Sequence, residues 1–184
     1  MSGIFIIPTN TCFGIWCFIK DLEWYNNIYK IKWRNFNKPI SIFVDSIEYL
    51  EKNTKLTTEN IKFLENYENP WTVLINIEDI TDKNLLYNIS KLQNNGIYKK
   101  IAFRISHTQL QQNLIKENWI FFLTSLNNSW EKEILKLDQL PDNLKQKLEK
   151  YNVKVLDKNI YSKQSFSDII EFKDNENVFL RKKA

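Results

Sequence analysis

The stretch Ile4-Phe5-Ile6-Ile7-Pro8-Thr9-Asn10-Thr11-Cys12-Phe13-Gly14 starts with four apolar residues and ends in a hydroxyl-rich segment. Ile4–Ile7 predicts a short buried strand, because it is a continuous apolar run that stops at a proline. Pro8–Gly14 predicts a turn, in which Gly14 permits a positive φ or the close approach of a ligand. A buried strand that runs into a hydroxyl-rich turn is one way to hold a polar substrate.

A helix is predicted after this turn, with Asp21 as its N-cap. Its apolar positions repeat at helical spacing: Leu22, Tyr25, Ile28 and Ile31. The helix ends in Lys32-Trp33-Arg34, and Lys38-Pro39 then opens a second strand over 40–44. This cationic cluster suits a phosphorylated ligand. It also has a simpler explanation, since cations commonly end helices, where they face the negative end of the dipole.

Predicted helices and predicted strands alternate along the rest of the chain. Helices are predicted over 46–53, over 57–67 with Thr57 or Thr58 as the cap, over 82–93, 108–116 and 141–150, and from Trp130 onward. Strands are predicted over 71–77, 101–105, 119–123, 153–156, 168–172 and 178–180, with a turn at 94–96. The expected class is therefore α/β, a single domain over residues 1–184 with a twisted mixed sheet and flanking helices.

Composition narrows the class of protein. The 184 residues are 43% hydrophobic and 14% aromatic, which favours a globular fold over disorder. No apolar run is long enough to cross a bilayer, and no signal-peptide pattern is present, so we expect a cytoplasmic protein without membrane contact. We also expect a monomer.

Metal and nucleophilic chemistry are disfavoured. Cys12 and Cys17 are the only cysteines, and His107 is the only histidine, so neither a zinc site nor a C-x-x-C redox pair is expected. One histidine makes a Ser-His-Asp or Cys-His mechanism a poor fit, although Cys12 and His107 could meet in the fold. A P-loop and a Rossmann fingerprint are both missing from the sequence.

The basic residues are informative because arginine is rare. Of 26 Lys plus Arg, only Arg34, Arg104 and Arg181 are arginine, so these three are expected where a planar, two-pronged donor is needed. Arg104 lies inside an apolar strand. On a sheet edge it would be unremarkable, whereas in a sheet interior it would require an anionic partner. The net charge of +4 allows an anionic ligand or a transient RNA contact.

A polar segment follows the aromatic strand that ends at Leu123. Thr124-Ser125-Leu126-Asn127-Asn128-Ser129 lies at the carboxyl end of that strand, where open α/β sheets usually bind ligands. The alternative is an ordinary loop with Ser129 as the N-cap of a following helix.

In combination these segments resemble the YrdC/TsaC family, the threonylcarbamoyl-AMP synthases. The resemblance rests on seven motifs in family order: 8–15 with P-T-[DE]-T-x-Y-G-L, 32–34 and 38–39 with K-x-R and K-P, 69–72 with G-P-x-T, 102–105 with A-V-R-[IVM], 124–129 with S-T-S-A-N-L-S, 167–171 with S-T-[IV]-[IV]-D, and 180–181 with L-R. Each motif is short, but together they span nearly the whole chain, and all three arginines fall within them.

The resemblance implies a YrdC-like domain with a concave basic cleft and a defined activity. The family condenses L-threonine, bicarbonate and ATP into threonylcarbamoyl-AMP and pyrophosphate, for threonylcarbamoyladenosine (t6A) modification of tRNA. It implies Lys32 and Arg34 as catalytic residues. It further implies ATP binding by Lys32, Arg34, Lys38, Thr124, Ser125 and Asn127, and threonine binding by Thr9, Thr11, Arg104 and Ser167.

The expected cofactor and partners follow from the same family. ATP is a substrate, and Mg²⁺ travels with it rather than in a protein cage. The TsaD/TsaB/TsaE-type transferase machinery would consume the product, and tRNA is a further possible ligand.

The chain departs from the family pattern at several positions: Asn10 for an acid, Phe13 for a tyrosine, Trp16 for a glycine, Leu126 and Trp130 for small residues, and Asp168 for a threonine. Asp168 would repel an anionic ligand unless it points away. These departures leave a second hypothesis, a catalytically degenerate YrdC-like protein whose basic face binds tRNA or rRNA. A hydrogenase-maturation relative is disfavoured, because such proteins carry additional acylphosphatase and zinc-finger regions.

Overall fold

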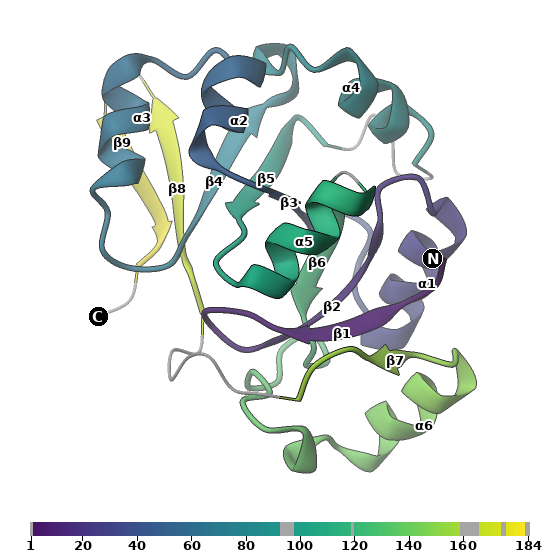
Figure 1. Ribbon diagram of the computed structural model, residues 1–184. Helices are drawn as coiled ribbons and strands as arrows, with labels where there is room; N and C mark the ends of the chain where they lie inside the picture. The colour runs from purple at the N-terminus through teal and green to yellow at the C-terminus, as the bar shows by residue number, and fades with distance from the viewer. Residues whose placement is uncertain (1, 93–97, 119, 159–165, 174–175, 183–184) are drawn as a thin grey trace.

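A nine-stranded mixed sheet organises the molecule, with the strand order β7-β1-β2-β6-β3-β5-β4-β8-β9 (Figure 1). The computed structural model describes residues 2–92, 98–118, 120–158, 166–173 and 176–182. The strands are β1 (Phe5–Pro8), β2 (Phe13–Phe18), β3 (Ser41–Val44), β4 (Trp71–Asn76), β5 (Lys100–Ile105), β6 (Phe121–Ser125), β7 (Lys154–Val155), β8 (Asp168–Lys173) and β9 (Glu176–Arg181). The helices are α1 (Leu22–Lys32), α2 (Ile47–Asn53), α3 (Thr58–Glu65), α4 (Lys83–Ser90), α5 (Gln109–Asn118) and α6 (Asp142–Lys150), with short 3₁₀ turns at Ile77–Asp79 and Leu137–Gln139.

The pairing of the strands confirms the predicted mixed α/β class. β3 runs parallel to β5, β4 to β8 and β1 to β7. The remaining neighbours are antiparallel. β1 and β2 are buried over their whole length and β6 over Phe121, Phe122 and Leu123, which explains their apolar runs.

Strand β2 is the main element that the sequence did not reveal. Residues 13–18 were expected to lead from the turn towards a helix, but they form a strand between β1 and β6. Gly14 lies inside this strand, and glycine is depleted in strands, which concealed the pattern. The remaining residues from Phe13 to Phe18 are bulky and fully buried.

The helix expected from Trp130 onward is also wrong. Residues 126–136 are irregular, and Trp130 takes φ 79°, which no helix accommodates. Ser129 therefore caps no helix. The expected turn at 94–96 and the start of the strand at Trp119 fall outside the described residues, and other element ends shift by a few positions.

Local signals explain the helix boundaries. α3 begins with the predicted cap Thr57, whose Oγ1 accepts from the Asn60 amide at 3.2 Å while the Asn60 side chain accepts from the Thr57 amide at 3.1 Å. α1 ends because Trp33 takes φ 48°, and the following amide, of Arg34, donates to the Tyr29 carbonyl at 3.0 Å. Asp21 precedes α1 as predicted, but its side chain makes no capping bond.

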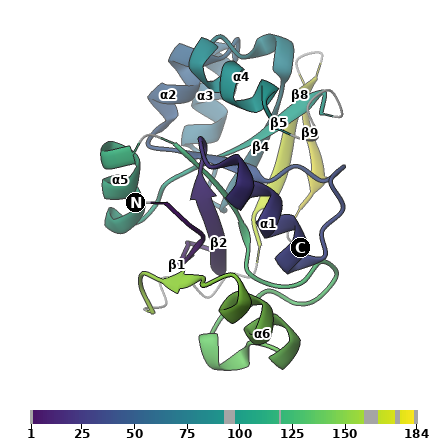
Figure 2. The ribbon, with the colours of Figure 1, turned by 90° about the vertical axis from the view of Figure 1, so that its right-hand side faces the viewer.

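The helices flank the sheet (Figure 2). Tyr25 of α1 packs on Phe122 of β6 with ring centroids 4.5 Å apart, and Phe63 of α3 packs on Phe172 of β8 at 5.9 Å. In Figure 2, α2, α3 and α5 lie on one side of the molecule, and α6 lies beneath β1. Among the described residues, no helix is both long and apolar enough to cross a membrane.

We expect Gly14→Ala to destabilise the protein by about 1–3 kcal/mol, since overpacking a filled site costs this much. A Cβ at Gly14 would lie 2.8 Å from Cδ1 of Leu123, which lies on the neighbouring strand β6 two residues before Ser125, the partner of Gly14. Urea denaturation measures the change. The matched test is the same substitution in a Leu123→Ala background, where it should cost less because the clash is gone. Equal costs in both backgrounds would contradict this packing explanation.

Candidate functional site

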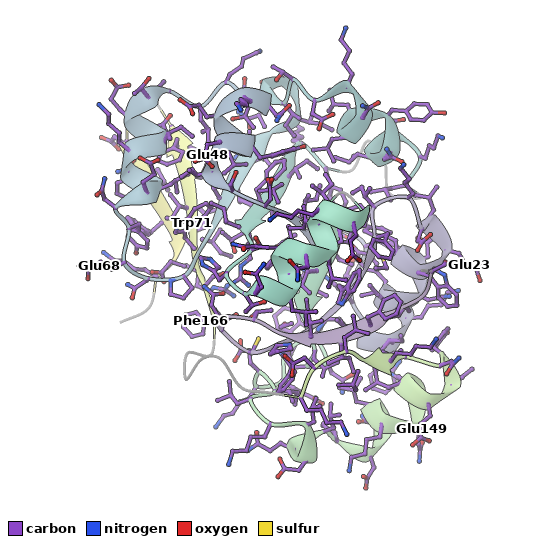
Figure 3. All side chains as sticks on the ribbon, in the orientation of Figure 1. Glu23, Glu48, Glu68, Trp71, Glu149 and Phe166 are labelled. Carbon is purple, nitrogen blue, oxygen red and sulfur yellow. The ribbon has the colours of Figure 1, made fainter. Side chains whose placement is uncertain are left out.

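A cavity of about 320 Å³ lies on one face of the sheet and collects all three arginines of the chain. Its floor consists of residues that face each other across paired strands: Ser41 opposite Leu123, Leu74 opposite Ala102, and Thr72 opposite Ile169. The turn between β1 and β2 and the segment after α1 form its walls. Figure 3 labels Phe166, another lining residue, which lies just before β8.

Arg104 approaches the cavity from the interior strand β5. Its Nη2 donates to Oδ1 of Asn10 at 2.8 Å, and both Nη atoms lie 3.4–3.5 Å from Oγ1 of Thr11. Its Nε is buried and has no partner among the described residues. Burial lowers the pKa of Arg104 to about 10, so the guanidinium remains charged at neutral pH. The described hydrogen-bond partners of Arg104 are neutral oxygens, so the anionic partner expected for an arginine in a sheet interior is not found among the described residues.

Arg181, at the end of β9, is held by Ser167, the first residue of the motif over 167–171. Its Nε and Nη2 donate to the Ser167 carbonyl at 2.9 and 2.6 Å, and the Ser167 hydroxyl bonds to Thr72 at 2.7 Å. This arrangement presents a guanidinium and two hydroxyls to one end of the cavity. Burial also lowers the pKa of Arg181.

Arg34 is fixed by two backbone carbonyls beyond the end of α1. Its Nε donates to the Lys38 carbonyl at 3.0 Å and its Nη2 to the Pro39 carbonyl at 2.8 Å. Nη1 has no hydrogen-bond partner in the described part of the chain. A guanidinium held at two corners keeps its remaining edge available for an anionic oxygen.

Lys32 is buried and spans the two elements that the sequence predicted to meet. Its Nζ donates to the backbone carbonyls of Ser125 and Asn127 in the segment after β6. Its side chain is 1% exposed, and burial, followed by the nearby Arg34 charge, lowers its pKa to about 7. The ammonium therefore does not line the cavity.

The hydroxyl-rich turn is organised around Thr9. The Thr9 hydroxyl donates to the Cys12 carbonyl at 2.8 Å and accepts from the amides of Thr11 and Cys12 at 3.1 and 3.2 Å. It also lies 2.9 Å from the Thr11 hydroxyl, which reaches the cavity. Thr9 shapes the turn, and Thr11 presents its side chain. Burial raises the pKa of the Cys12 thiol, which disfavours a thiolate nucleophile there.

The structure brings most of the predicted site residues into one place. The cavity is lined by Thr11, Arg34, Arg104, Thr124, Ser125 and Ser167, and not by Thr9, Lys32, Lys38 or Asn127. Asn127 donates through Nδ2 to the Glu131 carbonyl at 2.6 Å, while Lys38 lies with its Nζ 3.5 Å from the ring centroid of Trp130. A larger cavity of about 650 Å³ beside α4 contains none of these residues.

Sequence reasoning missed several lining residues: Cys12, Ser41, Thr72, Glu133 and Arg181. The sequence contained a signal for two of them, since Thr72 and Arg181 lie in motifs that resemble the family and Arg181 is one of three arginines. Glu133 carried no signal, because the segment that contains it was expected to be a helix.

The structure shows where the residues that depart from the family pattern lie. Asp168 points away from the cavity, where its Oδ2 accepts from the Tyr67 hydroxyl at 2.7 Å. Phe13 and Trp16 are core residues, and Trp16 stacks on Phe5 with centroids 4.8 Å apart. Among the described residues, no group of three His, Cys, Asp or Glu side chains is placed to hold a metal ion.

A family model named Sua5/YciO/YrdC, with the description "Telomere recombination", matches residues 1–183. The chain belongs to the Sua5/YciO/YrdC family. No curated protein sequence matches it. Within this family the chain keeps the whole fold despite low sequence identity to its solved relatives.

Three solved structures illustrate the similarity. Escherichia coli YciO superposes with a TM-score of 0.69 at 17% identity, covering 98% of this chain and 82% of YciO. P. abyssi Sua5 complexed with L-threonine superposes with a TM-score of 0.71 at 19% identity, and the match covers 97% of this chain and 50% of Sua5. Full-length HypF in the phosphate- and nucleotide-bound form superposes with a TM-score of 0.69 at 16% identity, and the match covers 97% of this chain and 26% of HypF. This chain therefore spans about half of Sua5 and a quarter of HypF.

We expect the stability of the protein to rise relative to Lys32→Met as pH is raised from about 7 towards 10. The folded-state pKa of Lys32, about 7, lies below the value of 10.5 for a free lysine, so the unfolded chain binds more protons in this window. Its contribution to the free energy of unfolding then increases by up to about 1.4 kcal/mol per pH unit. A neutral amine still has two N–H donors for the two carbonyls.

Urea denaturation of both proteins between pH 6.5 and 9.5 measures this difference directly. Both proteins contain the same tyrosines and cysteines, so the comparison with Lys32→Met removes the contribution of these groups to the pH dependence of stability. Parallel stability curves for the two proteins would show that Lys32 does not lose its proton in the folded state at these pH values.

Proposed function

We propose that this protein is an L-threonylcarbamoyladenylate synthase, which uses ATP, L-threonine and bicarbonate to make the precursor for t6A modification of tRNA. The observation that carries the proposal is the convergence of Arg34, Arg104 and Arg181 with Thr11 and Ser125 on one cavity. Family membership and the fold shared with a threonine-bound Sua5 support it. The YrdC-like fold shared with a nucleotide-bound HypF agrees with a nucleotide as the second ligand.

The proposed reaction needs no protein nucleophile. The threonine amine attacks the bicarbonate carbon, and loss of water leaves a carbamate. A carbamate oxygen then attacks the α-phosphorus of ATP, the bond to the β-phosphate oxygen breaks, and pyrophosphate leaves. The protein's part is to position three substrates and to neutralise negative charge as it moves onto pyrophosphate.

Arginines suit this task because each offers paired donors to carboxylate or phosphate oxygens. Arg34 and Arg104 are already fixed through some of their donors and keep Nη1 and Nε, respectively, without partners among the described residues. Ser125 and Thr124 line the same cavity as Arg34 and would contact the nucleotide. Thr11, Arg104 and Ser167 would contact threonine, and Mg²⁺ would arrive with the ATP phosphates.

The buried position of Lys32 suggests a positioning role. Its ammonium fixes the backbone of Ser125 and Asn127, and so it shapes the wall on which the nucleotide would lie. Contact with a phosphate would require Lys32 to exchange one of these carbonyls for a phosphate oxygen. Lys38, at the surface, remains available for the triphosphate.

Glu133 would complete the threonine site. It is the only carboxylate among the described residues that line the cavity, and no hydrogen bond or ion pair joins it to another described residue. The residue after Glu133 is fixed to β2, because the Phe13 amide donates a hydrogen bond to the Ile134 carbonyl at 2.9 Å. A zwitterionic amino acid needs an anion for its ammonium as well as a cation for its carboxylate, and the amine must lose a proton before it attacks. Glu133 can supply both functions.

Purified protein is expected to release pyrophosphate from ATP only when L-threonine and bicarbonate are both present. Arg34→Ala should lower kcat about 100-fold or more, because a donor to the developing charge is lost. Lys91→Ala, which removes a cation just after α4 and away from this cavity, should leave kcat unchanged. Absence of turnover in the wild type with all three substrates present would overturn the proposed function.

Glu133→Gln should raise KM for threonine at least tenfold, since a charge-assisted bond to the ammonium is worth roughly 1.5–3 kcal/mol. The KM for ATP should change little. Glu131→Gln is the matched control, because Glu131 lies two residues away and its carboxylate accepts from Asn128 outside the cavity lining. Equal threonine KM values for the wild type and Glu133→Gln would exclude this role.

A further inference from the structure

Two tryptophans stand out on the surface near the cavity. Trp33 is 69% exposed and Trp130 is 89% exposed, the highest values among the large apolar side chains of the described residues. Both take a positive φ, 48° for Trp33 and 79° for Trp130. Bulky residues are genuine outliers in this region, and such strain tends to persist where function requires it. Trp130 also occupies a position where the family pattern has a small residue.

The two tryptophans lie on loops that contact each other through the backbone. The Ser129 amide donates to the Lys32 carbonyl at 3.1 Å, which brings the residues just before the two indoles into contact. Each indole carries a lysine over its face: the Nζ atoms of Lys147 and Lys38 lie 3.3 and 3.5 Å from the ring centroids of Trp33 and Trp130, respectively. The result is an aromatic surface with two cations.

This surface borders the cavity without lining it. Trp130 lies in the chain between Ser125 and Glu133, both of which line the cavity, and Lys38 precedes the lining residue Pro39. Trp33 directly precedes Arg34, a third lining residue. At about 320 Å³ the cavity is at the small end of the range for small-molecule sites. It suits an amino acid and phosphates, and a nucleobase would extend beyond its rim.

We propose that Trp33 and Trp130 form a stacking platform for the purine base of the nucleotide whose phosphates enter the arginine cavity. This inference rests on the proposed function and adds residues that the family motifs do not supply. Indole faces stack on bases, while Lys38 and Lys147 provide charge for the phosphates or ribose oxygens alongside. The exposed indoles, the two strained backbones and the adjacent cavity all acquire one explanation.

Glycine substitutions test the platform without endangering the fold. Trp33→Gly and Trp130→Gly relieve the positive φ, so both variants should melt within a few degrees of the wild type. Calorimetric titration with ATP, without threonine or bicarbonate, should show Kd raised about tenfold in each variant, as expected for the loss of one base stack. Inorganic tripolyphosphate should bind both variants and the wild type equally, because it has no base.

Tyr87→Ala is the matched control. Tyr87 is an exposed aromatic residue with Lys91 Nζ 3.7 Å from its ring centroid, but it lies on α4, and its removal should leave the Kd for ATP unchanged. ATP binding that is the same in the wild type and both tryptophan variants would overturn the platform and leave the synthase proposal standing. Failure of the wild type to bind ATP at all would overturn both.

A third arm separates a free nucleotide from RNA. A single-stranded oligoribonucleotide titrated against the wild type should bind more weakly than ATP, since it cannot place a triphosphate in the cavity. If it binds more tightly than ATP, and the tryptophan variants lose that binding, the surface is an RNA site and the proposal fails. Quenching of tryptophan fluorescence by ATP but not by tripolyphosphate would support the platform independently.

Discussion

The burial of one lysine ammonium holds the functional region together. Lys32 reaches from the last turn of α1 to the carbonyls of Ser125 and Asn127, so the end of a helix and the end of the central strand β6 are fixed relative to each other. Desolvating a cation is costly, and the carbonyls offset only part of that cost, so burial lowers the pKa of Lys32 to about 7. Arg34 follows two residues later, and its place on the cavity wall depends on this anchor.

The three arginines that line the cavity are all fixed in a similar way. Each guanidinium is held by neutral oxygens: Arg34 and Arg181 by backbone carbonyls, and Arg104 mainly by Asn10. A carboxylate partner would have neutralised the charge and closed the site to an anionic ligand. Neutral partners fix the geometry and leave the positive charge available, which is the arrangement that preorganised electrostatic catalysis requires.

The departures from the family pattern fall into two groups. Five are accommodated by the fold: Asn10 accepts from Arg104, Asp168 accepts from Tyr67, and Phe13, Trp16 and Leu126 are buried in the core. Trp130 is not absorbed, because it is exposed and its backbone is strained. A residue that costs stability and fills no space in the core is the natural place to look for a specific role.

The sequence by itself determined the class of fold, most of the helices and strands, and six of the residues that line the cavity. Apolar periodicity, caps such as Thr57 and the scarcity of arginine are local properties, and they can be read directly from residue order. It did not show β2, where Gly14 interrupts the strand pattern, or the irregular segment around Trp130.

Only the tertiary structure decided the role of each side chain. Lys32 and Arg34 look alike in the sequence, yet the first is buried against carbonyls and the second faces the cavity. Glu133 gave no signal because its place in the same cavity as the arginines arises from contacts between residues far apart in the chain. Direction and burial depend on strand register and on such distant contacts, which no local pattern encodes.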